Sequence, residues 1–346
     1  MTVLSGTPAS AGFAMPAEWA PHERTLMAWP CRTDMWQAQL EVAKEQYAGV
    51  ANAIAAFEPV TMVCASAADA AQARAALSGD VEIVELPIDD SWLRDSGPIF
   101  VVDAAGRRAG VHFGFNAWGQ KFTPWDKDAE VGGRLVELAG DPLFRAPLIL
   151  EGGSLTVDGA GRLVTTEQCL LHPSRNPSMD AATIAGHLCD ALGVQDVVWL
   201  GQGLVEDLDT DGHVDLIAAF TAPGTLLLQS CPPGDPNHEA MAENADRARA
   251  AGLQVIDFPL LARPTVGGEQ IGASYLNLTI VNGAVVVPTA GVATDAEALE
   301  RIAAAYPEHE VVGVPGEVIA WGGGGPHCIT QQVPAASSLP AGALLA

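Results

Sequence analysis

The sequence has little positive charge. Only 17 of its 346 residues are Lys or Arg, against 42 Asp and Glu, which gives a formal net charge of −25. Binding to nucleic acid depends on Lys and Arg that neutralise phosphates, so this balance argues against a nucleic-acid partner. A negative field concentrates cations near a cleft, and the charge is therefore compatible with a small cationic substrate. It is equally compatible with a surface whose charge serves solubility alone.

Long apolar runs and paired cysteine motifs are also missing. No apolar run approaches the roughly 20 residues that a membrane helix requires, and the first residues have neither the basic stretch nor the apolar core of a secretion signal. We therefore expect a cytoplasmic protein without a membrane partner. None of the six cysteines forms a C-x-x-C pair, which argues against a zinc ribbon or a thioredoxin-type site. We expect free thiols and no bound metal.

What the sequence does contain is a recurring unit of two β-prone runs joined by a turn. Units begin at Asp95, Glu151, His213 and Ser274, and a fifth begins at Cys328. The successive starts are 56, 62, 61 and 54 residues apart, and such a near-constant period is typical of a structural repeat. D-G, P-G and N-G pairs between the runs favour hairpins.

Helices are predicted between these hairpins, because apolar residues recur there at helical spacing or strong helix formers dominate. The predicted helices cover residues 35–57, 67–77, 127–139, 178–192, 238–251 and 295–305. One further strand per unit is expected, for example at 197–200 and 310–314.

The fifth unit has almost no chain after Cys328, and the β-prone residues 23–30 are candidates for its missing strand. A ring closed by the two ends of the chain leaves no open sheet edge. The alternative is an open α/β sheet, whose helices alternate with single strands. We predict a single domain, residues 1–346, with an α/β fold of five pseudo-symmetric modules arranged as a propeller and closed by the N- and C-terminal segments.

Equivalent positions of modules around an axis face the same place. The unit starts therefore predict that Asp95, Glu151, His213 and Cys328 converge from separate modules. Asp215 follows His213 by two positions, and residues i and i+2 of a strand share a face, so both are expected in one cleft. The prediction is a pocket with one thiol, one imidazole and three carboxylates.

Four consecutive glycines, residues 322–325, almost directly precede Cys328. Glycine backbone can approach a ligand closely, and it permits a loop that opens and closes over a site. We therefore predict that Cys328 is a nucleophile at the end of a flexible loop. The alternative is a surface linker before a core cysteine, and a core position is what the apolar neighbours of Cys64, Cys169 and Cys189 predict.

A guanidinium substrate suits these groups. Carboxylates beside a cysteine raise the pKa of its thiol, which disfavours the reactive thiolate. A cationic guanidinium held between Asp95 and Asp215 offsets that effect. The guanidinium carbon is a poor electrophile, so it requires covalent attack by Cys328 and an acid for the departing ammonia. His213 fits this acid/base role, and Glu151 can orient the imidazole.

Further residues are predicted near the site. Trp92 and Trp118 can line the alkyl part of a diamine, since an indole face attracts a cation; the alternative is ordinary packing. Asp209 is a candidate for binding a terminal ammonium, and otherwise a solvated loop residue. His327 is expected to face away from Cys328 and to be structural, because neighbouring side chains of extended backbone alternate.

These residues lie in motifs that follow one another along nearly the whole chain. The motifs are M-P-A-E-W-A-P-H-E-R-T-L-M-A-W-P, W-L-R-D-S-G-P, F-N-A-W-G, P-W-D-K-D, L-E-G-G-S, R-N-P-S, D-T-D-G-H-V-D, A-S-Y-L-N and G-G-G-G-P-H-C-I-T-Q-Q. In this order they resemble the agmatine deiminase family, which is related to bacterial peptidyl-arginine deiminases within the guanidino-group-modifying pentein superfamily. The resemblance implies a five-module α/β propeller that hydrolyses agmatine to N-carbamoylputrescine and ammonia through a cysteine-bound amidino intermediate, without a cofactor.

Matched motif by motif, the resemblance makes Cys328 the nucleophile and His213 the general acid/base. Asp95 and Asp215 hold the guanidinium, and Glu151 supports both. Relatives are often dimers or larger, so the chain is compatible with a homo-oligomer. Three alternatives stay open: deimination of free or peptidyl arginine, amidino transfer to an amine, and a catalytically silent propeller used for binding. The complete set of five residues argues against the last.

Overall fold

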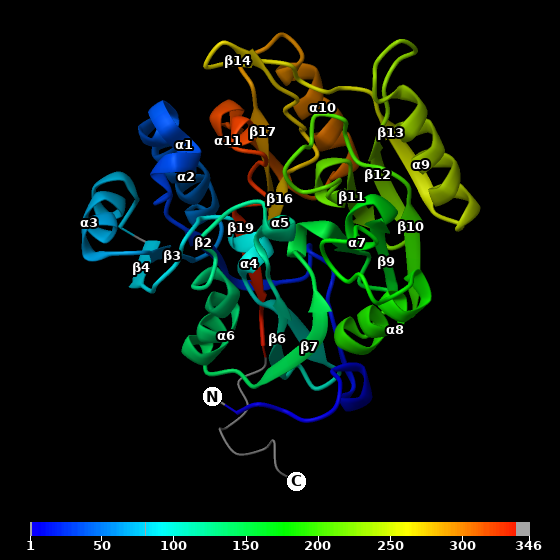
Figure 1. The fold of residues 1–346 in the computed structure, drawn as a ribbon. Coiled ribbons are helices and arrows are strands. Elements are labelled where there is room, and N and C mark those ends of the chain that lie inside the picture. Colours follow the sequence, from blue (N-terminus) through cyan, green and yellow to red (C-terminus); the bar gives the residue numbers. More distant parts are fainter. Residues whose placement is uncertain (1, 80, 337–346) are drawn as a thin grey trace.

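The chain folds as a mixed α/β structure in which hairpins alternate with helices. The computed structural model describes residues 2–79 and 81–336. Most of the longer helices lie at the outside of the molecule, whereas the short helix α4 (Leu93–Ser96) lies near its middle (Figure 1). None of the helices within these two ranges is long and apolar enough to cross a membrane.

The sheets are built from modules of one hairpin and one parallel strand. In one module, β8 (Leu155–Val157) pairs antiparallel with β9 (Arg162–Thr166), and the chain then passes through α8 (Ala181–Leu192). It returns as β10 (Asp196–Leu200), which pairs parallel with β9. A parallel pair requires such a crossover, and the helix supplies it.

Three further modules repeat this order of strand, strand, helix and strand. Their elements are β5 (Ile99–Asp103), β6 (Arg108–Gly114), α6 (Asp128–Ala139) and β7 (Leu143–Ile149); β11 (Ala218–Ala222), β12 (Thr225–Gln229), α9 (His238–Ala250) and β13 (Gln254–Phe258); and β16 (Thr279–Val281), β17 (Ala284–Thr289), α10 (Asp295–Ala305) and β18 (Glu310–Pro315). In each, the first two strands are antiparallel and the last two are parallel. The short strand β1 (Phe13–Ala14) pairs with β5.

The two ends of the chain share one sheet. Strand β19 (Thr330–Pro334), directly after Cys328, pairs antiparallel with β2 (His22–Ala28) near the N-terminus. The sheet order β19-β2-β3-β4 is completed by β3 (Val60–Cys64) and β4 (Val81–Glu85), with α2 (Leu40–Ala55) and α3 (Ala67–Ala76) as crossovers. The predicted strand at 23–30 and its pairing with the segment after Cys328 are confirmed.

The predicted helices agree with the observed ones except at the first. Helix α3 begins after Ser66, whose hydroxyl accepts a hydrogen bond from the backbone N–H of Asp69, and α10 has the predicted bounds. A single helix over residues 35–57 is wrong. Gln37 has a φ of 47°, which a continuous helix cannot contain, so the chain forms α1 (Thr33–Trp36), a 3-10 turn η2 (Gln37–Gln39) and then α2.

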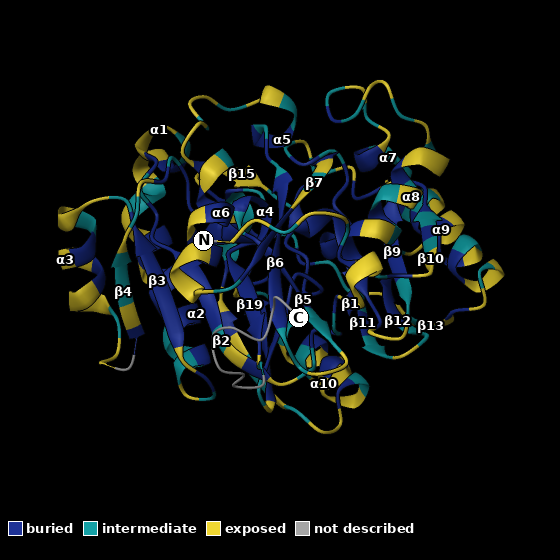
Figure 2. Cartoon of the chain, turned by 90° about the horizontal axis from the view of Figure 1, so that it is seen from below, coloured by how far each residue is buried: buried dark blue, intermediate teal, exposed yellow. Residues whose placement is uncertain are grey.

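The strands form the buried interior, and exposed residues gather on the outer helices and loops (Figure 2). All five residues of β3 are buried, as expected for a strand covered on both faces. Cys64 and Cys169 are fully buried, which confirms their predicted core positions, whereas Cys189 is only partly buried. All six cysteines are free thiols. The remaining short elements are η1 (Ala9–Ala11), α5 (Ala117–Gln120), α7 (Glu167–Leu170), β14 (Thr265–Val266), β15 (Glu269–Gln270) and α11 (Glu317–Trp321).

A short turn precedes the first strand of several modules, and these turns carry the predicted site residues. Helix α4 precedes β5, the 3-10 turn η3 (Gly152–Ser154) precedes β8, and η4 (Val214–Leu216) precedes β11. Residues 326–329 form a corresponding turn before β19. The prediction that His213 and Asp215 share a strand is therefore wrong. They do lie before the first strand of their module, as Asp95 and Glu151 do in theirs.

Candidate active site

A pocket lies beside Cys328. Its lining consists of Met35, Trp92, Asp95, Trp118, Phe122, Asp209, Thr210, Gly322, Gly323 and Cys328. The structure thus brings Cys328 and Asp95 together with Trp92, Trp118 and Asp209, the other residues that the sequence placed near a substrate. No Lys or Arg belongs to this lining.

The charged groups meet around Gly153 in η3. A Cβ atom at Gly153 would lie 2.7 Å from His213 Nδ1, 2.8 Å from Asp215 Oδ2 and 2.8 Å from Asp95 Oδ1. These three side chains come from α4 and from the segment around η4, in two different modules, and η3 belongs to a third. Only glycine leaves room for them at this position.

Asp95 is buried and held from two sides. Its Oδ2 accepts a hydrogen bond from Trp118 Nε1 at 2.8 Å, and its Oδ1 accepts one from the backbone N–H of Gly153 at 2.9 Å. Burial raises the pKa of Asp95 to about 6; Asp215 adds to this rise and His213 opposes it. The carboxyl group therefore changes charge close to neutral pH.

His213 is fully buried, and both of its ring nitrogens lack a hydrogen-bond partner among the described residues. Nδ1 lies 3.8 Å from Asp95 Oδ1, and Nε2 lies 4.0 Å from Glu151 Oε2. Oε2 of Glu151 likewise has no hydrogen-bond partner within the described part of the chain. The imidazole thus lies between two carboxylates, and its two nitrogens are available to exchange a proton with a bound molecule.

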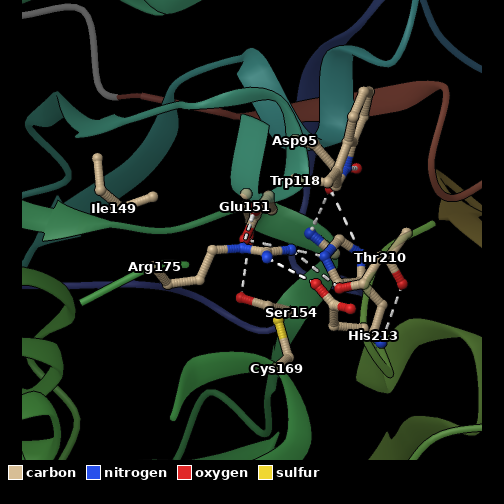
Figure 3. Close-up of polar contacts among 12 residues, drawn as sticks. Asp95, Trp118, Ile149, Glu151, Ser154, Cys169, Arg175, Thr210 and His213 are labelled. Atoms are coloured by element: carbon tan, nitrogen blue, oxygen red, sulfur yellow. Dashed lines mark hydrogen bonds and ion pairs between the residues drawn. The ribbon is translucent and has the colours of Figure 1, made fainter. Parts of the chain in front are cut away.

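Arg175 is a residue of this site that the sequence reasoning missed. Its Nε donates to Glu151 Oε1 at 2.7 Å, and both side chains are completely buried (Figure 3). The guanidinium also donates to Asp211 Oδ2 at 2.7 Å and to the backbone oxygen of Thr210 at 3.0 Å. The only available signal was the motif R-N-P-S, which gives no hint of a partner 24 positions earlier.

We expect replacement of Arg175 by Met to lower the free energy of unfolding by about 3–5 kcal/mol, because Glu151 would keep a buried charge without a partner. Thermal or urea unfolding measures this. Adding Glu151→Gln should recover part of the loss. Arg301→Met serves as the control: it breaks an exposed pair with Glu297 and should cost less than about 1 kcal/mol. Equal losses for Arg175→Met and Arg301→Met would contradict the expectation.

Cys328 is buried in the turn before β19. Its Sγ lies 3.1 Å from Asn277 Nδ2 and 3.3 Å from Asp215 Oδ2, and its backbone N–H donates to Asn277 Oδ1 at 3.2 Å. Burial, and then the charges of Asp215 and Asp95, raise the pKa of the thiol well above its usual value. The resting group is therefore a thiol that donates to Asp215. Asn277, in the motif A-S-Y-L-N, is a second contact that sequence reasoning missed.

The expected orientation of His327 is wrong. Its Nδ1 lies 2.8 Å from Asp215 Oδ2, the same oxygen that Cys328 Sγ approaches. Alternation of neighbouring side chains holds for extended backbone, but residues 326–329 form a turn, so both side chains can reach Asp215.

The glycines before Cys328 permit close packing at the pocket. A Cβ at Gly324 would lie 2.7 Å from Cβ of Cys328 and 2.8 Å from Cζ3 of Trp92, and one at Gly322 would lie 2.6 Å from the Trp36 ring. The predicted close approach of this backbone to a ligand stays a prediction. A loop that opens and closes stays a prediction.

The two tryptophans of the pocket are fixed by other aromatic rings. Trp92 stacks on Trp36 with ring centroids 5.6 Å apart, and Trp118 packs edge-on against Phe115 and Phe122 at 5.2 and 5.5 Å. Trp118 also has a φ of 53°, in the left-handed region that non-glycine residues rarely adopt. Its indole N–H is thereby directed to Asp95.

Asp209 lines the same pocket rather than facing open solvent. Burial, and then the neighbouring Asp207, raise the pKa of its carboxyl group, and Lys121 opposes this rise. The Lys121 ammonium donates to Asp211 Oδ1 at 2.7 Å and to the backbone oxygen of Asp209 at 2.8 Å. The Asp209 carboxylate therefore remains available to a cation in the pocket.

One group of described residues has donor atoms close enough to surround a metal ion. Glu151, Cys169 and His213 offer ligand atoms within 4.8 Å of one another, all buried. The Arg175 guanidinium lies 2.7 Å from Glu151 and repels a second cation there. The chemistry of this cluster is better described as an ion pair beside an imidazole.

Comparison with known proteins places this geometry in a family. The model of the Porphyromonas-type peptidyl-arginine deiminase family matches residues 14–334. The chain belongs to this deiminase family. The agmatine deiminase of Stutzerimonas stutzeri is 42% identical, over 97% of this chain and 99% of that protein. The likeness to agmatine deiminases that the motifs indicated is thereby confirmed.

Solved structures of this deiminase family share the fold. The agmatine deiminase of Enterococcus faecalis superposes with a TM-score of 0.91 at 34% identity, covering 97% of this chain and 100% of that one. A dimethylarginine dimethylaminohydrolase superposes with a TM-score of 0.51 at 16% identity, over 90% and 99% of the chains, which indicates a shared fold alone.

Proposed function

We propose that this protein is an agmatine deiminase, which hydrolyses agmatine to N-carbamoylputrescine and ammonia. The observation that carries the proposal is that Cys328 and Asp95 line one pocket, among whose described lining residues there is no Lys or Arg. Cys328 Sγ also donates a hydrogen bond to Asp215. Relatives named agmatine deiminases, similar over nearly the full length, support it.

In this proposal the guanidinium lies between the carboxylates of Asp95 and Asp215, where planar N–H groups can donate in pairs. Asp215 Oδ1 has no hydrogen-bond partner among the described residues and is available for this contact. Trp92 and Trp118 flank the alkyl chain, and Asp209 accepts the distal ammonium. The cation also stabilises the thiolate of Cys328, whose pKa is raised in the empty pocket by the same carboxylates.

The reaction then takes two steps. The Cys328 thiol releases its proton to solvent when the cation binds, its sulfur bonds to the guanidino carbon, and one C–N bond breaks. His213, oriented by Glu151, supplies the proton with which that nitrogen leaves as ammonia. Water next gives a proton to His213 and adds to the amidino carbon. The C–S bond breaks, and the ureido product forms by passing its extra proton to the sulfur. No cofactor takes part.

The runner-up proposal is a deiminase of peptidyl or free arginine, which the name of the matching family model favours. Both substrates of this class carry a carbonyl or carboxylate at the distal end. The carboxylate of Asp209 would repel the carboxylate of free arginine, and peptidyl arginine offers it no ammonium like the one in agmatine. The position of Asp209 in the pocket therefore favours agmatine.

The proposal is tested by incubating the purified protein with agmatine, arginine and a peptidyl-arginine analogue, while ammonia and ureido product are measured. We expect both products from agmatine. Release from another guanidine alone would move the assignment to that substrate. Loss of agmatine without ammonia, in the presence of an acceptor amine, would indicate an amidinotransferase. No reaction with any of them would favour a silent binding module.

We expect kcat/KM for agmatine to fall as the pH is lowered through about 6. Burial raises the pKa of Asp95 to about 6, so this carboxyl takes up its proton at a higher pH than an ordinary aspartate does. Protonated Asp95 no longer offers a negative partner to the guanidinium, so activity is kept above this pH and lost below it. The pKa of Asp215 is instead lowered, because the nearby histidines outweigh its burial. A kcat/KM profile that stays flat between about pH 8 and 5 would contradict this.

We also propose that residues 1–346 form a single domain whose five modules close into a ring. The pairing of β19 with β2 and the repeated module order support it. A cytoplasmic location is proposed because six free thiols, the proposed nucleophile among them, are typical of proteins in reducing surroundings. The chain is compatible with a homo-oligomer.

A further inference from the structure

His327, the residue before the proposed nucleophile, joins two buried carboxylates. Its Nδ1 lies 2.8 Å from Asp215 Oδ2, and its Nε2 lies 2.9 Å from Glu18 Oε1. Asp215 and His327 are almost completely buried, and Glu18 nearly so. A ring whose two nitrogens both face carboxylate oxygens is satisfied only when both carry a proton, that is, as an imidazolium.

The charges around His327 favour that form. Burial and the nearby Arg94 guanidinium lower the pKa of His327, but Glu18 and Asp215 outweigh them and the net effect is a raised pKa. The Arg94 Nε donates to the backbone oxygen of His327 at 3.2 Å. His327 in turn overcomes the burial of Glu18 and lowers the pKa of that carboxyl to about 2.

Glu18 has further neighbours, but none of them replaces His327. His22 and Arg94 contribute positive charge and lower its pKa, and Nε2 of His22 lies 2.8 Å from the backbone oxygen of Glu18. The buried Tyr306 is also close enough to sense the charge of Glu18. The described charged groups that act on the imidazole are therefore Glu18, Asp215 and Arg94.

The contacts run from Glu18 through His327 and Asp215 to the sulfur of Cys328. Asp215 Oδ2 accepts from His327 and also lies 3.3 Å from Cys328 Sγ. Asp95, which also meets Asp215 around Gly153, competes with it for charge, because like charges so close disfavour double ionisation. A fixed positive charge behind Asp215 removes that penalty.

We propose that Glu18 and His327 are positioning residues, which hold a positive charge behind Asp215 so that Asp215 stays ionised and aimed at the guanidinium and at Cys328. The proposal rests on the proposed function of the site. Glu18 does not line the pocket at Cys328: it borders a second cavity, with Trp19, Thr156, Asp215 and His327, and that cavity shares no lining residue with the pocket. Glu18 therefore acts through His327.

The test compares His327→Asn and Glu18→Gln with the wild-type protein. The asparagine amide can still donate to Asp215 but carries no charge, so Asp215 should be protonated at a higher pH. Without the charge of His327, protonation of Asp215 should replace that of Asp95 as the step that sets the acidic limb of the kcat/KM profile for agmatine. We expect this limb to move up by about one pH unit, which is about a five-fold loss at pH 6. Glu18→Gln keeps an acceptor of the same shape and should move the limb in the same direction by less.

The double variant separates positioning from general stability. In the His327→Asn background, Glu18 is a buried carboxylate without its partner, so adding Glu18→Gln should raise the melting temperature again without restoring the acidic limb. Glu58→Gln is the matched control: Glu58 is also buried, with His22 Nδ1 at 3.1 Å, but contacts neither Asp215 nor Cys328. It should lower stability and leave the limb in place.

A second readout does not require turnover. The alkylation rate of Cys328 by iodoacetamide, followed by mass spectrometry at about pH 8, should fall about five-fold or more in His327→Asn, because the thiolate loses a nearby positive charge. If wild-type protein does not hydrolyse agmatine, the proposed function fails while this rate still tests the positioning role. An acidic limb and an alkylation rate that are the same in His327→Asn, Glu18→Gln and Glu58→Gln would overturn the proposal.

Discussion

Replacement of Cys328 by Ser should abolish turnover while leaving the substrate pocket intact. Among the described residues, the side chain at position 328 contacts Asn277 and Asp215 but no imidazole, and a serine hydroxyl ionises far less readily than a thiol. We expect kcat to fall by at least about 10⁴-fold, as when the nucleophile of a covalent mechanism is removed. Agmatine should still bind, because the change in volume is small and the hydrogen bonds that Asp95 and Asp215 accept from Trp118, Gly153 and His327 remain. Turnover assays and isothermal titration with agmatine measure the two effects separately.

Cys169→Ala is the control for this experiment. Cys169 is buried close to Glu151 and His213, and burial followed by the charge of Glu151 raises the pKa of its thiol well above the usual value. It does not line the pocket, so its loss should reduce kcat by less than about ten-fold. Turnover retained by Cys328→Ser, or lost equally in both variants, would refute the proposed nucleophile.

Module order and most helix positions could be predicted because their signals are local. Gly159, Gly224 and Gly283 of the D-G, P-G and N-G turns have φ values of 67°, 71° and 78°, the left-handed conformation that such turns require. The content of each module, a hairpin, a helix and one further strand, followed from the constant spacing of hairpins, and the pairing of β2 with β19 from the lack of chain after Cys328.

The local conformation of the site could not be predicted in the same way. Asp215 and Cys328 lie in turns, where a side chain's direction depends on backbone angles that residue type does not determine. This is why the convergence of the charged groups was predicted correctly and the orientation of His327 was not. Sequence spacing identifies equivalent positions in a repeat, but it does not give the direction in which a side chain in a turn points.

The contacts that Glu18 and Asn277 make with the turn at Cys328 could not be predicted for a different reason. Glu18 meets His327 across 309 positions, and Asn277 meets Cys328 across 51. Glu18 lies in the motif M-P-A-E-W and Asn277 in the motif A-S-Y-L-N. Neither motif indicates that its partner is the segment with His327 and Cys328. Their role depends on the packing of distant modules against one another.

Gly153→Ala should inactivate the protein without unfolding it. The new Cβ would lie 2.7–2.8 Å from His213, Asp215 and Asp95, closer than real Cβ atoms come to other atoms, so these groups must move apart by several tenths of an ångström. All three are buried and cannot swing into solvent. Because displacements of this size at reacting groups are costly, we expect kcat/KM for agmatine to fall by about 10²-fold or more. Overpacking should lower the free energy of unfolding by about 1–3 kcal/mol.

Gly186→Ala gives the matched comparison for the same substitution. Gly186 lies inside α8, where a Cβ would meet nothing within 4 Å. In a helix interior, alanine is more stable than glycine by about 0.5–1 kcal/mol. This variant should be slightly more stable and fully active. Kinetics and thermal unfolding of both variants distinguish a steric effect at the carboxylates from a general effect of added methyl groups. A Gly153→Ala protein that keeps kcat/KM within about three-fold of wild type would mean that His213, Asp95 and Asp215 do not need the spacing seen around Gly153, and that the site chemistry built on this spacing is incorrect.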